Sequence, residues 1–197
     1  MNSNNESQKE QESLEQLLNR LQIQPNEWDL LLVGDGSGSK WGYPIGWGCV
    51  AVYPNRLDRK VYWGCASSGT VNIAESLAYL IPLTEFAKDT HDQAKVNKRN
   101  EPKNVHIVTD SEYARRRGEG SGSIDFKKNS AIWAGLEMFN RQGIFLHWHH
   151  KPREDVALNR YADAVSKEAR RQAKNKKMLT DLFDKQKMLV AEHNPRN

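Results

Sequence analysis

The sequence is poor in cysteine and contains no long hydrophobic run. Its 197 residues include two cysteines, Cys49 and Cys65, which lie in β-like segments without the spacing of metal ligands. Two buried thiols in a reducing compartment are therefore a simpler interpretation than a disulfide. No apolar stretch approaches the length that spans a membrane, and the polar, acidic start lacks a basic segment followed by an apolar one. We therefore expect a soluble, cytoplasmic or otherwise intracellular protein with no membrane partner.

Positive charge is concentrated outside the first 27 residues. The net charge is +4, but residues 1–27 hold five acidic and two basic side chains, which leaves about +7 for the remainder. Basic runs at residues 115–117, 127–128 and 167–177 are candidate phosphate-binding surfaces. A solvated helix face is the alternative interpretation of any one of these runs.

Helix and strand patterns alternate along the chain. Leucines at helical spacing from Leu14 to Leu21 predict an amphipathic helix that ends before Pro25. Three strands joined by turn-prone loops are predicted at 28–35, 46–54 and 58–69, which is typical of an antiparallel meander. A helix at 72–88, a polar surface insertion at 88–104 and a strand at 105–110 follow. The remaining pattern predicts helices from 111, at 129–139, at 159–174 and at 178–189, with a last strand at 143–150.

This order of elements predicts an α/β fold. Its mixed five-stranded sheet has three antiparallel strands followed by two parallel ones, flanked by helices. We expect an N-terminal helical extension at residues 1–27, a catalytic domain at 28–173 and a basic, amphipathic helical extension at 174–197. Three roles stay open for the terminal helices: packing on the domain, forming a homodimer, or docking on a replication partner.

Four acidic residues stand at predicted strand ends and on predicted helices. Asp35 ends the run LLLVGD and Asp110 ends VHIVTD, while Glu75 and Asp163 lie on helix-like segments. Carboxylate oxygens suit Mg²⁺ or Mn²⁺, and four negative charges in one pocket are tolerable only when cations neutralise them. The pattern predicts a metal-dependent enzyme acting on phosphodiester bonds. Taken singly, Asp110 could be an acid at a helix N-terminus and Asp163 a solvated helix residue.

Four sequence motifs, DGSGSKWGYPIGWG, TVNIAE, TDSEY and NRYADAVSKEA, occur in this order along the chain. Together they resemble the ribonuclease H type 1 family over residues 28–173. The resemblance implies an endonuclease that hydrolyses the RNA strand of RNA–DNA hybrids with two Mg²⁺ ions, or Mn²⁺ in their place, leaving 5′-phosphate and 3′-hydroxyl ends. It also implies that Asp35, Glu75, Asp110 and Asp163 are the catalytic, metal-binding carboxylates, with Asp35 bridging both ions.

The resemblance also indicates residues that contact the hybrid. A hybrid displays 2′-hydroxyls across a wide minor groove, where small polar groups fit. Gly36 and Ser37 follow the first aspartate, Asn72 is the leading 2′-hydroxyl or base-edge contact, and Thr70 is expected to contact a phosphate. The alternative interpretation makes Asn72 a helix N-cap and Thr70 a loop residue.

The chain departs from the family in how it holds the hybrid. The basic helical protrusion of bacterial members is shortened here, and Glu112 stands where the family often has glutamine. An acid is thereby placed near the nucleic acid. The expected basic contacts are Arg115, Arg116, Arg117, Lys127 and Lys128.

Arg153 lies in a PRE segment ten residues before Asp163, where many family members hold a mobile histidine. As a catalytic residue it would hold the scissile phosphate or stabilise the leaving oxygen, since a guanidinium stays charged. His149 and His150 are the alternatives for this role. Together with His147 they otherwise fit a sheet surface better than a zinc site, because no fourth ligand has suitable spacing.

Two other functions are compatible with these residues. A nuclease of the same fold could act on double-stranded RNA or branched DNA. A non-catalytic nucleic-acid-binding or assembly protein could keep the fold after its site had decayed, but the four intact carboxylates disfavour it.

Overall fold

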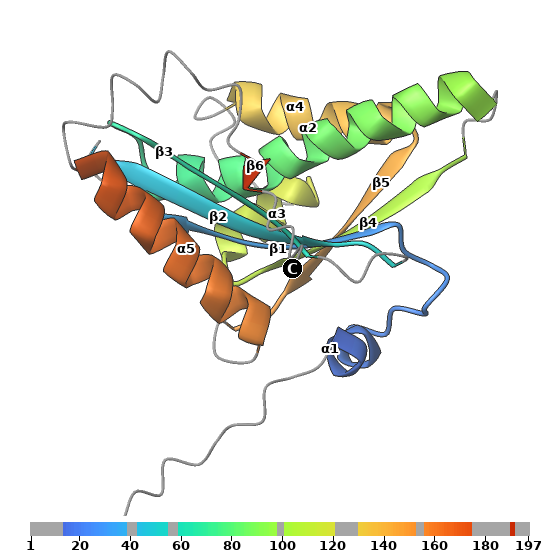
Figure 1. Ribbon diagram of the computed structural model, residues 1–197, viewed down its shortest axis with the longest axis horizontal. Helices are drawn as coiled ribbons and strands as arrows, with labels where there is room; N and C mark the ends of the chain where they lie inside the picture. The colour runs from blue at the N-terminus through green and yellow to red at the C-terminus, as the bar shows by residue number, and fades with distance from the viewer. Residues whose placement is uncertain are drawn as a thin grey trace, which may run out of the picture.

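A mixed sheet runs through the centre of the molecule (Figure 1). The computed structural model describes residues 14–38, 43–54, 59–97, 101–120, 130–152, 156–174 and 190–191. The predicted five-stranded sheet is confirmed: β1, β2 and β3 pair antiparallel, β4 is parallel to β1, and β5 is parallel to β4. A two-residue strand, β6 (Val190–Ala191), adds antiparallel to β3. The order is β5-β4-β1-β2-β3-β6, with β1 Leu30–Ser37, β2 Ile45–Val52, β3 Lys60–Ala66, β4 Lys103–Thr109 and β5 Ile144–His150.

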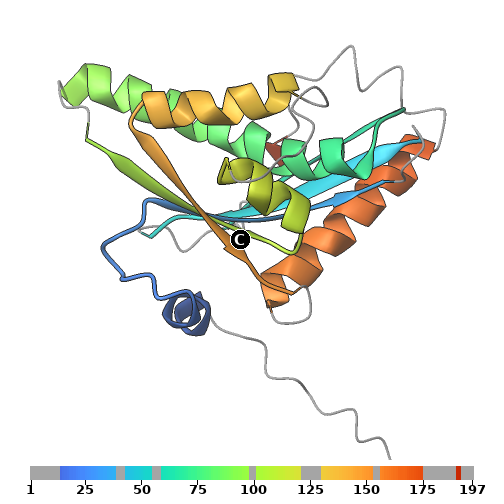
Figure 2. The same cartoon turned by 180° about the vertical axis from the view of Figure 1, so that it is seen from behind.

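Helices cover both faces of the sheet (Figures 1 and 2). α2 (Val71–Asn97), α3 (Glu112–Gly118) and α4 (Ser130–Arg141) share one face, where Tyr79 and Phe139 join Leu30 and Leu32 in one core. α1 (Leu14–Arg20) and α5 (Ala157–Lys174) lie on the other face, with Leu31 among the residues beneath them. Alternate β1 side chains enter different cores, which explains the continuous apolar run of this strand.

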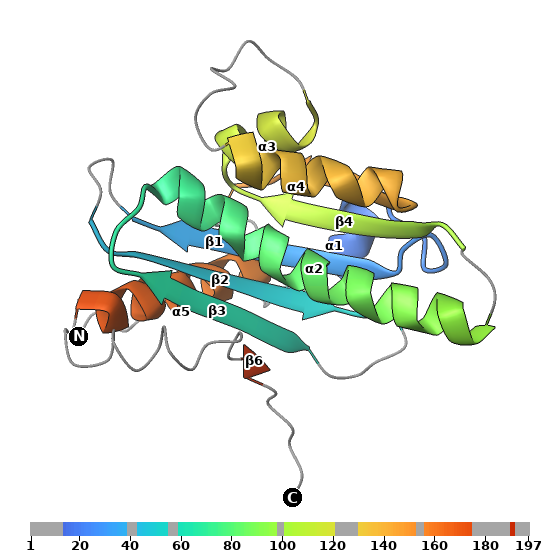
Figure 3. The same ribbon diagram turned by 90° about the horizontal axis from the view of Figure 1, so that it is seen from above.

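Helix α2 is longer than the sequence indicates, and in Figure 3 it runs along the length of the sheet. It continues to Asn97, so the predicted surface insertion is wrong over residues 88–97. Ala87, Thr90 and Ala94 recur at helical spacing and line a groove against α4. Their small side chains carry little of the hydrophobic signal on which a periodicity prediction depends. The lysine, aspartate and glutamine residues between them are mostly exposed, so the segment reads as polar although it is helical.

Both cysteines are free and buried, as predicted. Burial raises the pKa of the Cys49 thiol well above its usual value, which keeps this group protonated and unreactive. Within the described residues, no helix has both the length and the apolar character that a membrane crossing requires.

The N-terminal helix α1 packs on the domain. Leu17 is 2% exposed, and it shares a core with Trp28, Leu31 and Val156. The helix is only seven residues long, so tertiary packing rather than intrinsic propensity must hold it. The domain boundary at residues 27 and 28 stays a prediction, and the helix predicted at 178–189 lies outside the described residues.

Leu17→Ala is expected to lower the free energy of unfolding by about 2 to 4 kcal/mol, because it removes buried methyl groups and leaves a cavity. Leu18→Ala, at the neighbouring and only partly buried position, should lower the free energy of unfolding clearly less. Urea denaturation of both variants measures the difference. Equal, small losses would show that α1 does not contribute to the core.

Candidate active site

Asp35 and Asp110 lie at the same edge of the sheet. Val33 on β1 pairs with Val108 on β4, so Asp35 and Asp110 each follow this pair by two residues. Because the two strands are parallel, their carboxyl ends meet at one edge. Asp35 is 4% exposed, a deep position for a carboxylate.

Glu75 approaches this edge from the first turns of α2. A Cβ atom on Gly36 would collide with the Glu75 backbone nitrogen and lie 2.7 Å from the Ala74 carbonyl carbon, so α2 rests directly on the strand end. Ser111 Oγ donates a hydrogen bond to Glu75 Oε2 at 2.6 Å. The same hydroxyl accepts from Ala114 N and thereby caps α3. This hydrogen bond therefore joins the β4–α3 junction, next to Asp110, to the start of α2 at Glu75.

Asp163 is brought to the same edge by α5. Ser166 Oγ lies 2.9 Å from Asp35 Oδ2 and 2.9 Å from the Asp163 backbone oxygen. Lys167 Nζ lies 2.7 Å from Asp163 Oδ2. The buried Ser166 thus connects the segments that carry Asp35 and Asp163.

Tyr79 is a buried residue near this site that sequence reasoning missed. Its hydroxyl donates to the Gly34 backbone oxygen at 2.6 Å and reaches the Val108 oxygen at 3.3 Å. Burial raises the pKa of this phenol well above its usual value, so it remains a donor. Tyr79 therefore links β1 to β4 close to Asp35 and Asp110. Its position one helical turn after Glu75 was the sequence feature that could have indicated a place near the site.

The four predicted carboxylates therefore surround one edge of the sheet, but their oxygens do not form a finished cage. Among the described residues, no three acidic, histidine or cysteine side chains are already gathered as a metal-binding group. The donor set itself fits Mg²⁺ or Mn²⁺, since all four candidates offer hard carboxylate oxygens. Ser166, Ser111 and Lys167 each contact one of three of these carboxylates, Asp35, Glu75 and Asp163 respectively.

The predicted minor-groove residues lie beside this edge. Gly36 and Ser37 end β1, and Thr70 and Asn72 lie at the start of α2. Thr70 caps the helix, because its hydroxyl accepts from Ile73 N at 3.3 Å and its carbonyl oxygen accepts from Ile73 N and Ala74 N. The interpretation of Asn72 as the N-cap is therefore wrong.

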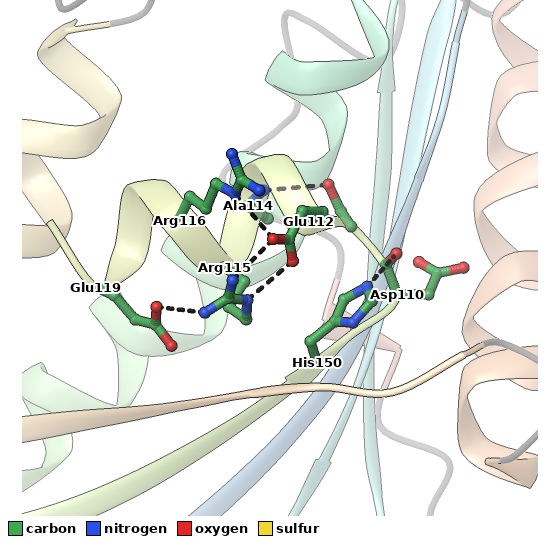
Figure 4. A network of polar contacts seen from close by, with 8 residues as sticks. Asp110, Glu112, Ala114, Arg115, Arg116, Glu119 and His150 are labelled. Atoms are coloured by element: carbon green, nitrogen blue, oxygen red, sulfur yellow. Dashed lines mark hydrogen bonds and ion pairs between the residues drawn. The ribbon is translucent and has the colours of Figure 1, made fainter. Parts of the chain in front are cut away.

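Two arginines predicted to hold the hybrid, Arg115 and Arg116, contact carboxylates of α3 and its C-cap (Figure 4). Arg115 contacts both Glu112 oxygens at 2.7 and 2.9 Å and also pairs with Glu119, while Arg116 lies 2.8 Å from Glu112. Hydrogen bonds from Arg115 and then Arg116 lower the pKa of Glu112 to about 2. The negative charge of Glu112 is therefore offset by Arg115 and Arg116.

Arg117 instead lies over the Tyr113 ring, with its guanidinium carbon 5.9 Å from the ring centroid. Lys127, Lys128 and Arg153 lie outside the described residues. The roles of these four basic residues toward the hybrid stay predictions.

His150 and His149 occupy different surroundings at the end of β5. His150 Nε2 lies 3.2 Å from the backbone oxygen of Asp110 (Figure 4). His149 Nε2 instead lies 2.9 Å from His106 Nδ1, and His147 stacks on His106 with ring centroids 4.7 Å apart. Of the two histidine alternatives to Arg153, His150 is the one beside an acidic position.

The pKa of half-buried His106 is lowered to about 4, first by burial and then by His147 and His149. A base with a lowered folded pKa contributes stability that is complete above its unfolded value near 6.5 and is lost as the pH falls through 4. After allowance for the solvent around this ring, we expect protonation of His106 at low pH to lower the free energy of unfolding by about 1 to 2 kcal/mol.

His106→Gln should therefore flatten the loss of stability between pH 6.5 and 4, as measured by urea denaturation across that range. His91→Gln, on an exposed position of α2, serves as the matched control and should keep the original slope. Identical slopes in the parent chain and both variants would refute the role of His106.

Comparisons with known proteins support the fold. No protein-family model matches the sequence, and no curated protein is similar to it. The N-terminal RNase H domain of a Mycobacterium tuberculosis protein has a TM-score of 0.58 and 17% identity, covering 76% of this chain and 99% of that chain. LC11-RNase H1 in complex with an RNA/DNA hybrid has a TM-score of 0.54 and 21% identity, covering 74% of this chain and 99% of that chain. RNase H1 from Halobacterium salinarum has a TM-score of 0.53 and 17% identity, with coverages of 72% and 96%, so the chain has a ribonuclease H-like fold.

Proposed function

We propose that this chain is a type 1 ribonuclease H that hydrolyses the RNA strand of RNA–DNA hybrids. The observation that carries the proposal is the convergence at one sheet edge of the four separate segments that carry Asp35, Glu75, Asp110 and Asp163, in a ribonuclease H-like fold. One similar structure was solved in complex with an RNA/DNA hybrid, which is consistent with this substrate.

The four carboxylates would hold two Mg²⁺ ions, or Mn²⁺ in their place. When bound, such ions supply an activated water and charge stabilisation for the leaving 3′ oxygen, giving 5′-phosphate and 3′-hydroxyl products. Asp35 is the most deeply buried of the four and would help to hold the ions at the inner end of the site. Ser111 would keep Glu75 oriented before substrate arrives.

Substrate discrimination would come from the surface beside the carboxylates. Gly36, Ser37 and Asn72 would offer backbone and small polar groups to a minor groove lined by 2′-hydroxyls, and Thr70 would contact a phosphate. Arg115 and Arg116 would reach phosphates only by exchanging their carboxylate partners. We assign Arg153 to the scissile phosphate or leaving oxygen, with His150 as the alternative.

A substrate panel tests this proposal. The purified chain is given end-labelled RNA–DNA hybrid, double-stranded RNA, double-stranded DNA, branched DNA and single strands, each with Mg²⁺ or with EDTA. We expect Mg²⁺-dependent cleavage of the RNA strand of the hybrid only. Preferred cleavage of double-stranded RNA or branched DNA would replace the hybrid as substrate, and binding without cleavage would favour a non-catalytic protein.

A further inference from the structure

Ser166 differs from an ordinary buried serine of a helix. A hydroxyl inside a helix commonly bonds a carbonyl of its own preceding turn. Ser76 in α2 does this, with its Oγ 2.7 Å from the Asn72 oxygen. Ser166 reaches the Asp163 oxygen in the same way but is also 2.9 Å from Asp35 Oδ2, across the interface between α5 and the sheet. Both serines are fully buried, so the cross-element contact is what distinguishes them.

A glycine on β2 makes this contact possible. Gly48 is the register partner of Asp35, and a Cβ atom there would lie 2.8 Å from Val165 Cγ1 and 2.9 Å from the Ala162 oxygen. The missing side chain lets α5 lie directly on the strand beside Asp35. Ser166, one residue after Val165, is thereby brought within hydrogen-bond distance of the carboxylate.

The hydroxyl has one proton to donate and two acceptors within reach. A carboxylate accepts a stronger and more directional hydrogen bond than a neutral carbonyl, so the proton should go to Asp35. A carboxylate that is 4% exposed has little contact with water, so a protein donor takes the place of solvent hydrogen bonds. The hydrogen bond therefore holds the direction of Asp35 Oδ2.

We infer that Ser166 is a positioning residue that orients Asp35 and holds it in register with Asp163. Its role in cleavage rests on the proposed function, but the hydrogen bond itself does not. Loss of a partner that orients a metal-binding side chain typically costs about 10- to 100-fold in metal affinity or activity.

The test compares Ser166→Ala with Ser76→Ala, which removes an equally buried helical hydroxyl that bonds a backbone carbonyl of its own helix. The Asp35 side chain is followed by NMR at one fixed pH without metal, through its χ1 couplings and its carboxyl carbon resonance, and hybrid cleavage is measured separately. We expect Ser166→Ala alone to shift that resonance and to spread χ1 of Asp35 over more than one rotamer. It should also lower kcat about 10- to 100-fold with little change in KM.

Ser166→Cys keeps a donor at this position, although a weaker one on a larger atom, so it should lie between the parent chain and Ser166→Ala. The same Asp35 resonance and χ1 in the parent chain and in Ser166→Ala would overturn the inference. If the parent chain cleaves no hybrid, the proposed function fails, while a change of the Asp35 side chain specific to Ser166→Ala would still support the positioning role.

Discussion

Asp35→Asn is expected to reduce Mg²⁺-dependent hybrid cleavage by at least about 10³-fold, because metal-bound charge stabilisation is worth several kcal/mol. The amide keeps the size of the side chain and can still accept from Ser166 Oγ. The protein should therefore remain folded, and removal of a negative charge from a crowded acidic edge should leave its stability without metal unchanged or slightly higher. Single-turnover cleavage and thermal unfolding measure the two effects.

Asp92→Asn is the matched control for this change. Asp92 lies on the distant half of α2, is exposed, and contacts Lys95 at 3.8 Å. It makes the same change in net charge away from the candidate site, so cleavage should stay near the parent rate. Near-normal turnover by a folded Asp35→Asn protein would contradict the assignment of Asp35 to the metal site.

Gly36→Ala is expected to lower both stability and activity. The added Cβ atom would meet backbone atoms of Ala74 and Glu75, which cannot move aside as a side chain can. Overpacking of this kind costs about 1 to 3 kcal/mol, and separation of α2 from β1 would shift Glu75 relative to Asp35. For a chain of this size the cost corresponds to a fall in Tm of roughly 2 to 4 °C for each kcal/mol.

Gly135→Ala in α4 provides a control with room for the new atom. Its Cβ would lie 3.4 Å from Leu80 Cδ1, an ordinary contact with a side chain, and alanine is the better helix former. This variant should be as stable as the parent chain or more so. If Gly36→Ala behaves in the same way, α2 does not depend on the close approach at Gly36.

The sheet and the acidic positions could be predicted because their signals are local. The run ending in Asp35 is apolar on both faces and the run ending in Asp110 is interrupted only by His106, so the two aspartates follow from where these runs stop. The far half of α2 was missed because Ala87 and Ala94 face α4 with side chains too small to produce a clear period. Helix capping by Thr70 was missed because α2 begins at Val71, two residues before the start that Asn72 as the N-cap would give.

Contacts between distant segments could not be predicted from residue types. Ser166 meets Asp35 across 131 positions of sequence, and only the packing of α5 on Gly48 brings them together. His106 joins His149 through the register of β4 and β5, which no local pattern specifies. The pairing of Arg115 with Glu112 and Glu119 could have been predicted, since spacings of three and four residues on a helix favour such pairs.

Cleavage of a hybrid labelled on its RNA strand, with Mg²⁺ and with EDTA, is the most direct measurement of the central claim. The parent chain should produce RNA fragments with 5′-phosphate and 3′-hydroxyl ends in Mg²⁺ and none in EDTA, while the DNA strand stays intact. Unchanged RNA in Mg²⁺, or equal cleavage in EDTA, would contradict the account of four carboxylates acting through bound metal.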